Sequence, residues 1–236
     1  MSTRISFFDV GNLGKVGVQT FLKGMASEKF SATQAAGFLL TRQSSQQVEG
    51  RYVQKIVAVE SFDDPFGKKY SYERTVYTEQ KFILRLESPN LVLFDSNSAG
   101  KALMGRLSEF SGFRVALKPL NWAPEELLVS FAKRFAPVRV FAATVDGLKL
   151  SPSVTVRLCF ESSDDVLTHV RSFLKKKTTA FESLKIEFSY LASTWRCELR
   201  RNGSIQIYGD FDPSITSAVL ELVHRHVVRT VIKTPA

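Results

Sequence analysis

The clearest pattern of hydrophobic and polar positions lies between Ser183 and Arg229. Trp195, Cys197 and Leu199 alternate with charged residues, a period of two that predicts a half-buried strand. The flanking segments LKIEFSYL and SIQIY alternate in the same way, and both are expected to pair with this strand. The segment that follows, ITSAVLELVHRHVVR, repeats its apolar residues at helical spacing. We therefore expect antiparallel strands covered on one face by a C-terminal helix.

The connection between the last two of these strands is predicted to be a loop over residues 201–203. A two-residue turn would set Leu199 opposite Gln206, so that polar and apolar side chains would share a face. The longer loop pairs Leu199 with Ile205 and places Gly203 in the left-handed conformation at a bulge. This register puts the apolar side chains on one face of the sheet.

The first part of the chain carries helical signals. Apolar residues recur at helical spacing over residues 15–26, and Ser31 to Gln34 before AAGFLL match a capping box that opens a second helix. Residues 43–50 (QSSQQVEG) are polar and without periodicity, which predicts a linker. The sequence therefore predicts a helical N-terminal segment over residues 1–45.

Alternating segments separated by turn residues dominate the remainder of the chain. Asp64, Pro65 and Gly67 are typical turn residues, and Pro124 suits the first turn of a helix. Strands are predicted at residues 51–60, 70–77, 81–87, 91–95, 113–120, 138–145 and 154–160. Helices are predicted from Ser96 or Asn97 to Phe110, over residues 124–135, and from Ser162 to the lysines at 175–177.

These elements predict an α+β fold with mainly antiparallel sheets backed by amphipathic helices. Beyond the N-terminal segment, we expect a first α+β unit over residues 50–136 and a second over residues 137–236. Residues 81–110 and 195–223 share one order of elements: strand, tight turn, strand, polar cap and amphipathic helix. The two units are therefore expected to be related strand-hairpin-helix structures.

This repeated segment resembles the hairpin-then-helix half of a TATA-box-binding-protein repeat. The resemblance covers about 30 residues in each copy and rests on the order of elements alone. It implies that helices back a curved sheet, and that the free face of the sheet grips DNA.

The net charge is the strongest compositional signal. Lys and Arg number 32 against 23 Asp and Glu, which gives +9 and a pI near 9.6. Such an excess favours polyanionic partners, nucleic acid above all. The cations are spread along the chain, so the charge indicates a basic surface without locating it. With 44% hydrophobic residues, the chain is long enough and apolar enough to bury a core.

Cysteine usage and hydropathy bear on the compartment. Cys159 and Cys197 fall in predicted strands and have no CxxC spacing, which favours a reduced intracellular protein. The N-terminus MSTRISFFDV has too short an apolar run for a signal peptide, and no stretch is long enough to span a membrane. We therefore expect a cytoplasmic protein, or a nuclear one in a eukaryote, without membrane contact.

Candidate contacts to nucleic acid come from the C-terminal sheet and from basic element ends. The outward face of that sheet is predicted to carry Lys185, Glu187, Ser189, Arg196, Glu198, Arg200, Ser204, Gln206 and Tyr208. The carboxylates on this face equally suit an ordinary solvated sheet. Basic clusters at element ends, where phosphate contacts commonly arise, are Arg171 with Lys175, Lys176 and Lys177, then Arg200 with Arg201, then Arg225 with Arg229. The alternative is a solvated helix terminus, which is the more common explanation for a run of three lysines.

The sequence holds no motif for a cofactor, a metal site or a known catalytic centre. The three histidines, His169, His224 and His226, are expected to be structural or surface residues. One enzyme pattern is present: Asp64, Glu79 and Lys81 occur in the order of a metal-dependent nuclease's carboxylate, carboxylate and lysine.

The favoured hypothesis is a non-catalytic subunit that binds DNA or RNA through a basic surface. Its phosphate contacts would be Arg171, Lys175, Lys176, Lys177, Arg196, Arg200, Arg201, Arg225 and Arg229, with Tyr208 as a stacking group. The alternative is a structural or adaptor subunit that binds protein partners in an assembly. A Mg²⁺-dependent nuclease is the third hypothesis.

Overall fold

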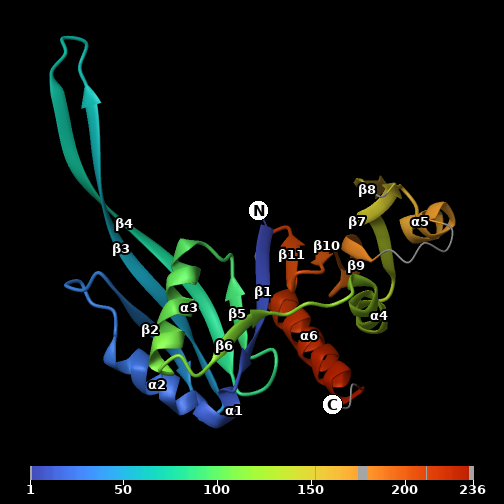
Figure 1. The fold of residues 1–236 in the computed structure, drawn as a ribbon, viewed down its shortest axis with the longest axis horizontal. Coiled ribbons are helices and arrows are strands. Elements are labelled where there is room, and N and C mark those ends of the chain that lie inside the picture. Colours follow the sequence, from blue (N-terminus) through green and yellow to red (C-terminus); the bar gives the residue numbers. More distant parts are fainter. Residues whose placement is uncertain (1, 152, 175–179, 211, 234–236) are drawn as a thin grey trace. The chain divides into compact units, whose positions relative to one another are not determined.

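The structure is a computed structural model that describes residues 2–151, 153–174, 180–210 and 212–233. It confirms an α+β protein in which antiparallel strands are backed by helices (Figure 1). The chain forms two compact units. Unit 1 comprises Met1–Asp9 and Lys118–Ala236, and unit 2 comprises Val10–Leu117.

Unit 2 holds an antiparallel sheet in the order β2-β3-β4-β5. The strands are β2 (Ala36–Gln43), β3 (Gln47–Asp63), β4 (Lys69–Arg85) and β5 (Leu91–Phe94), and β6 (Ala116–Pro119) begins in this unit, which ends at Leu117. The helices are α1 (Leu13–Val16), α2 (Val18–Ser27) and α3 (Ser98–Phe110).

The core of unit 2 forms between the sheet and the helices α2 and α3. Phe38 on β2 contacts the rings of Tyr52, Phe82 and Phe110, with centroids 5.0 to 6.1 Å apart. As the sequence predicts, a polar residue caps α3: the Oδ1 of Asn97 accepts the backbone N–H of Ala99 at 2.8 Å. This cap fixes where the helix begins above the sheet.

β3 and β4 run far beyond their neighbours and project from the sheet of unit 2 as a two-stranded ribbon (Figure 1). Their pairing continues without a register shift from Gln47↔Arg85 to Asp63↔Lys69. The segments 70–77 and 81–87, predicted as separate strands, therefore belong largely to one continuous strand. At the tip, the Asp64 carboxylate accepts the backbone N–H groups of Phe66 and Lys68, which confirms the predicted turn.

Unit 1 holds an antiparallel sheet in the order β1-β11-β10-β9-β7-β8. Its strands are β1 (Ser2–Gly11, of which the part up to Asp9 belongs to this unit), β7 (Val138–Ser151), β8 (Val154–Glu161), β9 (Phe181–Tyr190), β10 (Ser193–Arg200) and β11 (Ser204–Tyr208). The helices are α4 (Pro124–Arg134), α5 (Val166–Leu174) and α6 (Pro213–Lys233).

The helices of unit 1 pack on one face of its sheet. Ile186, Cys197, Leu199 and Ile205 are fully buried beneath them. The predicted register is confirmed, because Leu199 pairs with Ile205. Gly203 has φ of 71°, and an added Cβ would lie 2.1 Å from the carbonyl oxygen of Leu120. Glycine is therefore required at this loop on two independent grounds.

The predicted helical N-terminal segment is wrong. Ser2–Gly11 forms strand β1, which pairs with β11, and Ala36–Gln43 forms strand β2 in place of a second helix. The helix predicted over residues 15–26 is confirmed, because α2 covers most of this range. Tertiary strand pairing outweighs the capping-box pattern at residues 31–34. Gly37 in β2 lies against the backbone of residues 28–30, where a Cβ would meet the Cα of Phe30 at 2.6 Å. Of the linker predicted over residues 43–50, only residues 44–46 form a turn between β2 and β3, and residues 47–50 already belong to β3.

None of the helices within the described ranges combines the length and the apolar content that crossing a bilayer requires.

Candidate nucleic-acid interface

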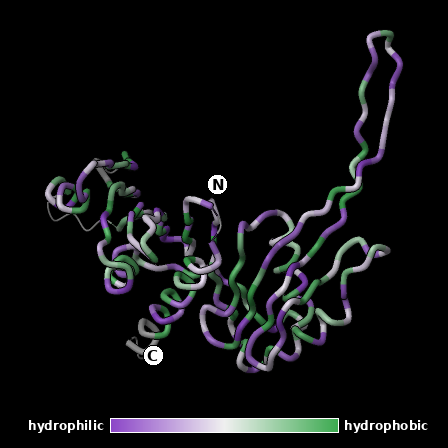
Figure 2. Tube along the Cα trace, turned by 180° about the vertical axis from the view of Figure 1, so that it is seen from behind, coloured by the Kyte–Doolittle hydropathy of each residue, from purple (hydrophilic) through white to green (hydrophobic). Residues whose placement is uncertain are grey.

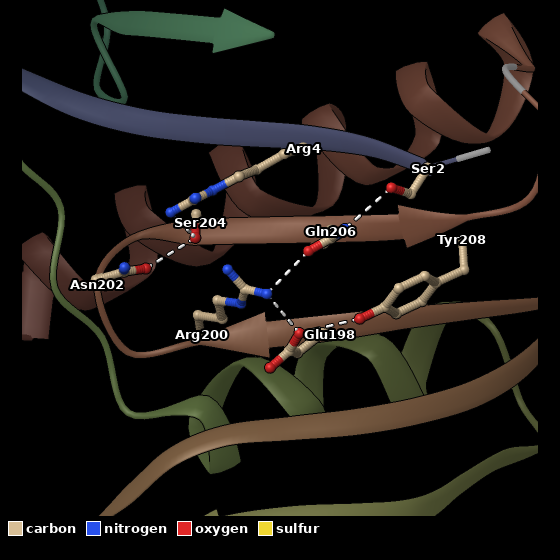
Figure 3. Close-up of polar contacts among 8 residues, drawn as sticks. All are labelled: Ser2, Arg4, Glu198, Arg200, Asn202, Ser204, Gln206 and Tyr208. Carbon is tan, nitrogen blue, oxygen red and sulfur yellow. Dashed lines mark hydrogen bonds and ion pairs between the residues drawn. The ribbon is translucent and has the colours of Figure 1, made fainter. Parts of the chain in front are cut away.

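The side of the unit 1 sheet opposite its helices carries polar and charged residues. Strand registers align these side chains across five neighbouring strands. We call this surface the open face and define it as Ser2, Arg4, Ser6, Arg139, Thr144, Ser183, Lys185, Glu187, Arg196, Glu198, Arg200, Ser204, Gln206 and Tyr208. Figure 3 shows part of this face, with α4 and α6 behind the sheet.

Two arginines on the open face share one carboxylate. Glu187 on β9 accepts hydrogen bonds from Arg139 Nη2 and from Arg196 Nε, both at 2.9 Å. Arg139 also donates to the carbonyl oxygen of Ser163, and the Arg196 guanidinium lies 5.4 Å from the centroid of the Phe141 ring. The group has a net charge of +1, and these contacts fix the position of both guanidinium groups.

A second group is centred on Glu198 (Figure 3). Its carboxylate accepts hydrogen bonds from Arg200 Nη2 at 2.8 Å and from the Tyr208 hydroxyl at 3.0 Å. Arg200 also donates to Gln206 Oε1, and Gln206 in turn donates to the Ser2 hydroxyl at 3.0 Å. The network therefore joins β10, β11 and β1 through side chains as well as through the backbone.

The pKa values of both carboxylates lie below the ordinary range. A hydrogen bond from Arg196 is the largest cause of the lowered pKa of Glu187, and Arg139 adds to it. Burial alone would raise the pKa of Glu198, but hydrogen bonds from Arg200, Ser183 and Tyr208 reverse the direction. Both glutamates are therefore ionised at neutral pH. Burial raises the pKa of Tyr208, and the charge of Glu198 raises it further.

The open face is basic despite these ion pairs. It holds five Lys or Arg residues and two Glu residues, a net charge of +3. The carboxylates lie deeper than the cations: the side chains of Arg196 and Arg139 are 59% and 39% exposed, against 22% for Glu187. Arg200 is likewise more exposed than Glu198. An approaching ligand therefore meets guanidinium groups before carboxylates.

The structure brings some of the predicted site residues together and separates others. Arg196, Arg200 and Tyr208 share the open face, while the exposed Arg201 lies in the adjoining β10–β11 loop. Arg225 lies on α6, on the helical side of the sheet, where it pairs with Glu221. The remaining predicted contacts are Arg171, which is exposed on α5, and Lys175, Lys176, Lys177 and the Arg229 side chain, which fall outside the described residues.

Two cations of the open face were missed by sequence reasoning. Arg4 belongs to β1, within the segment predicted to be helical, and Arg139 is the second residue of β7, whose outward-facing residues the sequence pattern does not assign. Ser2 and Arg4 alternate with the buried Thr3 and Ile5, and this alternation is the signal in the sequence that would have placed Arg4 on the open face. Arg139 could be placed only through the β7–β9 register, in which it pairs with Glu187.

The nuclease pattern is not assembled. Asp64 lies at the tip of the β3–β4 ribbon, whereas Glu79 lies at its base and pairs with Arg51 at 2.9 Å. The ten residues from Lys69 to Glu79 span about 33 Å of strand, so one metal ion cannot contact both carboxylates. Across the described ranges, no group of three or more His, Cys, Asp or Glu side chains is suited to hold a metal.

Comparison with known protein families finds no match for this chain, and comparison with curated proteins finds none either.

Proposed function

We propose that this protein binds nucleic acid without catalysis, and that the open face of unit 1 is the binding surface. The observation that carries the proposal is the layered charge of this face, in which exposed arginines overlie more deeply placed carboxylates. Guanidinium groups bind phosphate oxygens through paired N–H donors, and a pre-positioned arginine loses less side-chain entropy on binding. The five cations lie on four of the five strands of the face, which suits contact with several phosphates.

Binding of this kind is directed at the backbone of the nucleic acid. Tyr208 is half-buried and its hydroxyl donates to Glu198, so the ring is held within the face. Phe141 lies beneath the Arg196 guanidinium. The aromatic groups thus support the cations, and the proposed interface tolerates many nucleotide sequences.

Fluorescence anisotropy with labelled oligonucleotides tests the proposal. Duplex DNA, single-stranded DNA and single-stranded RNA of about 20 nucleotides are titrated at roughly 50 and 200 mM salt. Three net charges correspond to a slope of about −2 to −3 in log affinity against log salt for a duplex. The absence of binding to all three probes at the lower salt concentration rejects the proposal.

A pair of double variants locates the interface. Arg139→Gln with Arg196→Gln removes the two arginines that share Glu187, and binding is expected to weaken at least tenfold. The matched control is Arg134→Gln with Arg225→Gln, which removes two arginines that share Glu221 on the helical side of unit 1. An equal or larger loss in the control variant places the contacts on the helices and rejects the open face.

The second candidate function is that of a subunit in a protein assembly. The observation that favours it is the β3–β4 ribbon, whose exposed side chains include Ile56, Val59, Phe62, Phe66 and Tyr72. Exposed apolar surface of this kind marks protein contact sites. Deleting the ribbon tip should then leave nucleic-acid affinity unchanged and alter only protein association, which sedimentation velocity measures.

A further inference from the structure

The projecting ribbon has two chemically different faces. We define the arm as residues 56–76, with cross-strand pairs from Ile56↔Val76 to Asp63↔Lys69. One face, the front face, carries Ile56, Ala58, Glu60, Phe62, Tyr70, Tyr72, Arg74 and Val76. The back face carries Val57, Val59, Ser61, Asp63, Lys69, Ser71, Glu73 and Thr75. Apolar and aromatic side chains dominate the front face only, so the arm is amphipathic.

The front face continues the core face of the unit 2 sheet. Side chains on alternate residues of a strand share a face, so Ile56 lies on the same face as the buried Tyr52. Tyr52 is covered by neighbouring rings such as Phe38 in the core, whereas Ile56 is 43% exposed. The hydrophobic pattern of the core thus runs on into a segment that has only two strands. Green segments recur along the arm in Figure 2.

A two-stranded ribbon cannot cover its own apolar face. Isolated hairpins are marginally stable in water, and a sheet face is normally buried against a second layer. Phe62 and Tyr70 stack with centroids 5.4 Å apart, yet they remain 55% and 41% exposed. Lys68 lies 5.3 Å from the centroid of the Tyr70 ring. The side chains are ordered among themselves and still offer a broad apolar surface.

The two ionised side chains in the front-face rows balance each other, and Lys68 at the tip adds a single cation beside Tyr70. Glu60 and Arg74 form an ion pair at 3.7 Å, and the Tyr72 hydroxyl donates to Glu60. An apolar surface with a single cation in excess disfavours nucleic acid and anionic lipid as partners, because both bind through clusters of several cations. It suits a partner with the same balanced pattern.

We propose that the front faces of two copies of this chain pack against each other, making the arm a homodimerisation element. A two-fold axis parallel to the arm sets β3 of one copy over β4 of the other. Phe62 then lies over Tyr70 of the second copy, and Ile56 over its Val76. Glu60 faces Tyr72 of the second copy and is close to its Arg74. Each row of side chains therefore meets a compatible row, without contact between like charges.

The available area suits a weak dimer. Three half-exposed aromatic side chains offer about 300 Å² per copy, and the aliphatic groups raise this to about 500 Å². Two copies would bury about 1,000 Å² in total, which is the lower limit for a specific interface. The association is therefore concentration-dependent. It does not depend on whether the open face binds nucleic acid.

Analytical ultracentrifugation of the full chain from roughly 5 to 200 µM tests the proposal, and a monomer–dimer equilibrium is expected. Phe62→Ser with Tyr70→Ser should weaken dimerisation at least tenfold. The matched control, Val57→Ser with Val59→Ser, removes two exposed side chains from the back face and should leave the equilibrium unchanged. A monomer at every concentration overturns the proposal, as does an equal effect of both double variants.

Discussion

Arg196 and Glu187 are joined across β10 and β9 by a hydrogen bond of 2.9 Å in which the guanidinium is far more exposed than the carboxylate. An exposed ion pair of this kind adds little to stability. Its effect is to hold a flexible cation in one place. If an anion binds there, the carboxylate determines both the position of the arginine and the net charge that the anion meets.

Replacing Glu187 with Gln is expected to strengthen nucleic-acid binding. Gln can still accept a hydrogen bond from Arg196, while the net charge of the open face rises from +3 to +4. One unit charge at contact distance in water corresponds to about 1 kcal/mol, or about a fivefold gain in affinity. Fluorescence anisotropy at low salt measures this gain in nucleic-acid affinity. Weaker binding of this variant would indicate that the carboxylate itself contacts the ligand, contrary to the proposed interface.

Glu198 makes stability depend on pH. Its pKa is lower in the folded protein than the ordinary value of 4.5, because hydrogen bonds to the charged form outweigh burial. The stabilisation is therefore fully present above that ordinary value and is lost as the pH falls through the folded pKa. Glu198→Gln should lower the free energy of unfolding by about 1 to 3 kcal/mol at pH 7 and flatten its loss on acidification.

Urea unfolding between pH 3 and pH 7 measures this effect. Glu161→Gln is the control, because Glu161 is exposed at the end of β8. It should change the free energy of unfolding by less than about 0.5 kcal/mol. Identical pH profiles for the parent and Glu198→Gln would contradict the role given to the Glu198 network.

The C-terminal part of the fold follows from local sequence, and the N-terminal part does not. The alternation of Cys197 and Leu199 and the glycine at 203 together determine the β10–β11 hairpin, because only one register buries the apolar face. By contrast, β1 pairs with β11, about 200 residues away in the chain. The alternation of polar and apolar residues in β1 is too short to exclude a helix. The strand conformation of β1 is therefore determined by its long-range pairing with β11.

The candidate site shows the same division. Arg196 and Arg200 could be assigned to one face from the period of β10 alone. The ion pairs that surround them could not, because the Arg139–Glu187 contact spans 48 residues and depends on the long-range pairing of β7 with β9. Basic residues near the open face in sequence, such as Arg225, proved to lie on the opposite side of the sheet.

Gly203→Ala is expected to destabilise unit 1 strongly. The residue has φ of 71°, and the new Cβ would lie 2.1 Å from the Leu120 carbonyl oxygen. We expect a loss of at least about 3 kcal/mol in the free energy of unfolding, since backbone atoms on both sides must shift.

The matched control separates the two causes. Gly147 has φ of 75°, and a Cβ added there would have no heavy atom within 4 Å, so Gly147→Ala carries the conformational cost alone. That cost is about 1 to 2 kcal/mol. Urea unfolding compares the variants. Equal losses would mean that the close approach of Leu120 to the loop contributes nothing.

The two cysteines are expected to differ sharply in reactivity. Cys159 is exposed, whereas Cys197 is fully buried beneath the helices of unit 1. Burial, with a smaller contribution from the charge of Glu198, raises the pKa of the Cys197 thiol well above its ordinary value. Since the thiolate is the reactive form, an alkylating reagent at pH 8 should modify one thiol in the folded protein and both after denaturation.

Mass spectrometry counts the added groups over time, and Cys159→Ser supplies the control. That variant should resist modification until it unfolds, so its rate of labelling reports opening of the β9–β10–β11 core. The rate should fall when the free energy of unfolding rises, and it should increase in the Gly203→Ala variant, because both residues belong to the same hairpin. Rapid labelling of folded Cys159→Ser would show that Cys197 is accessible, and the packing described for unit 1 would then be incorrect.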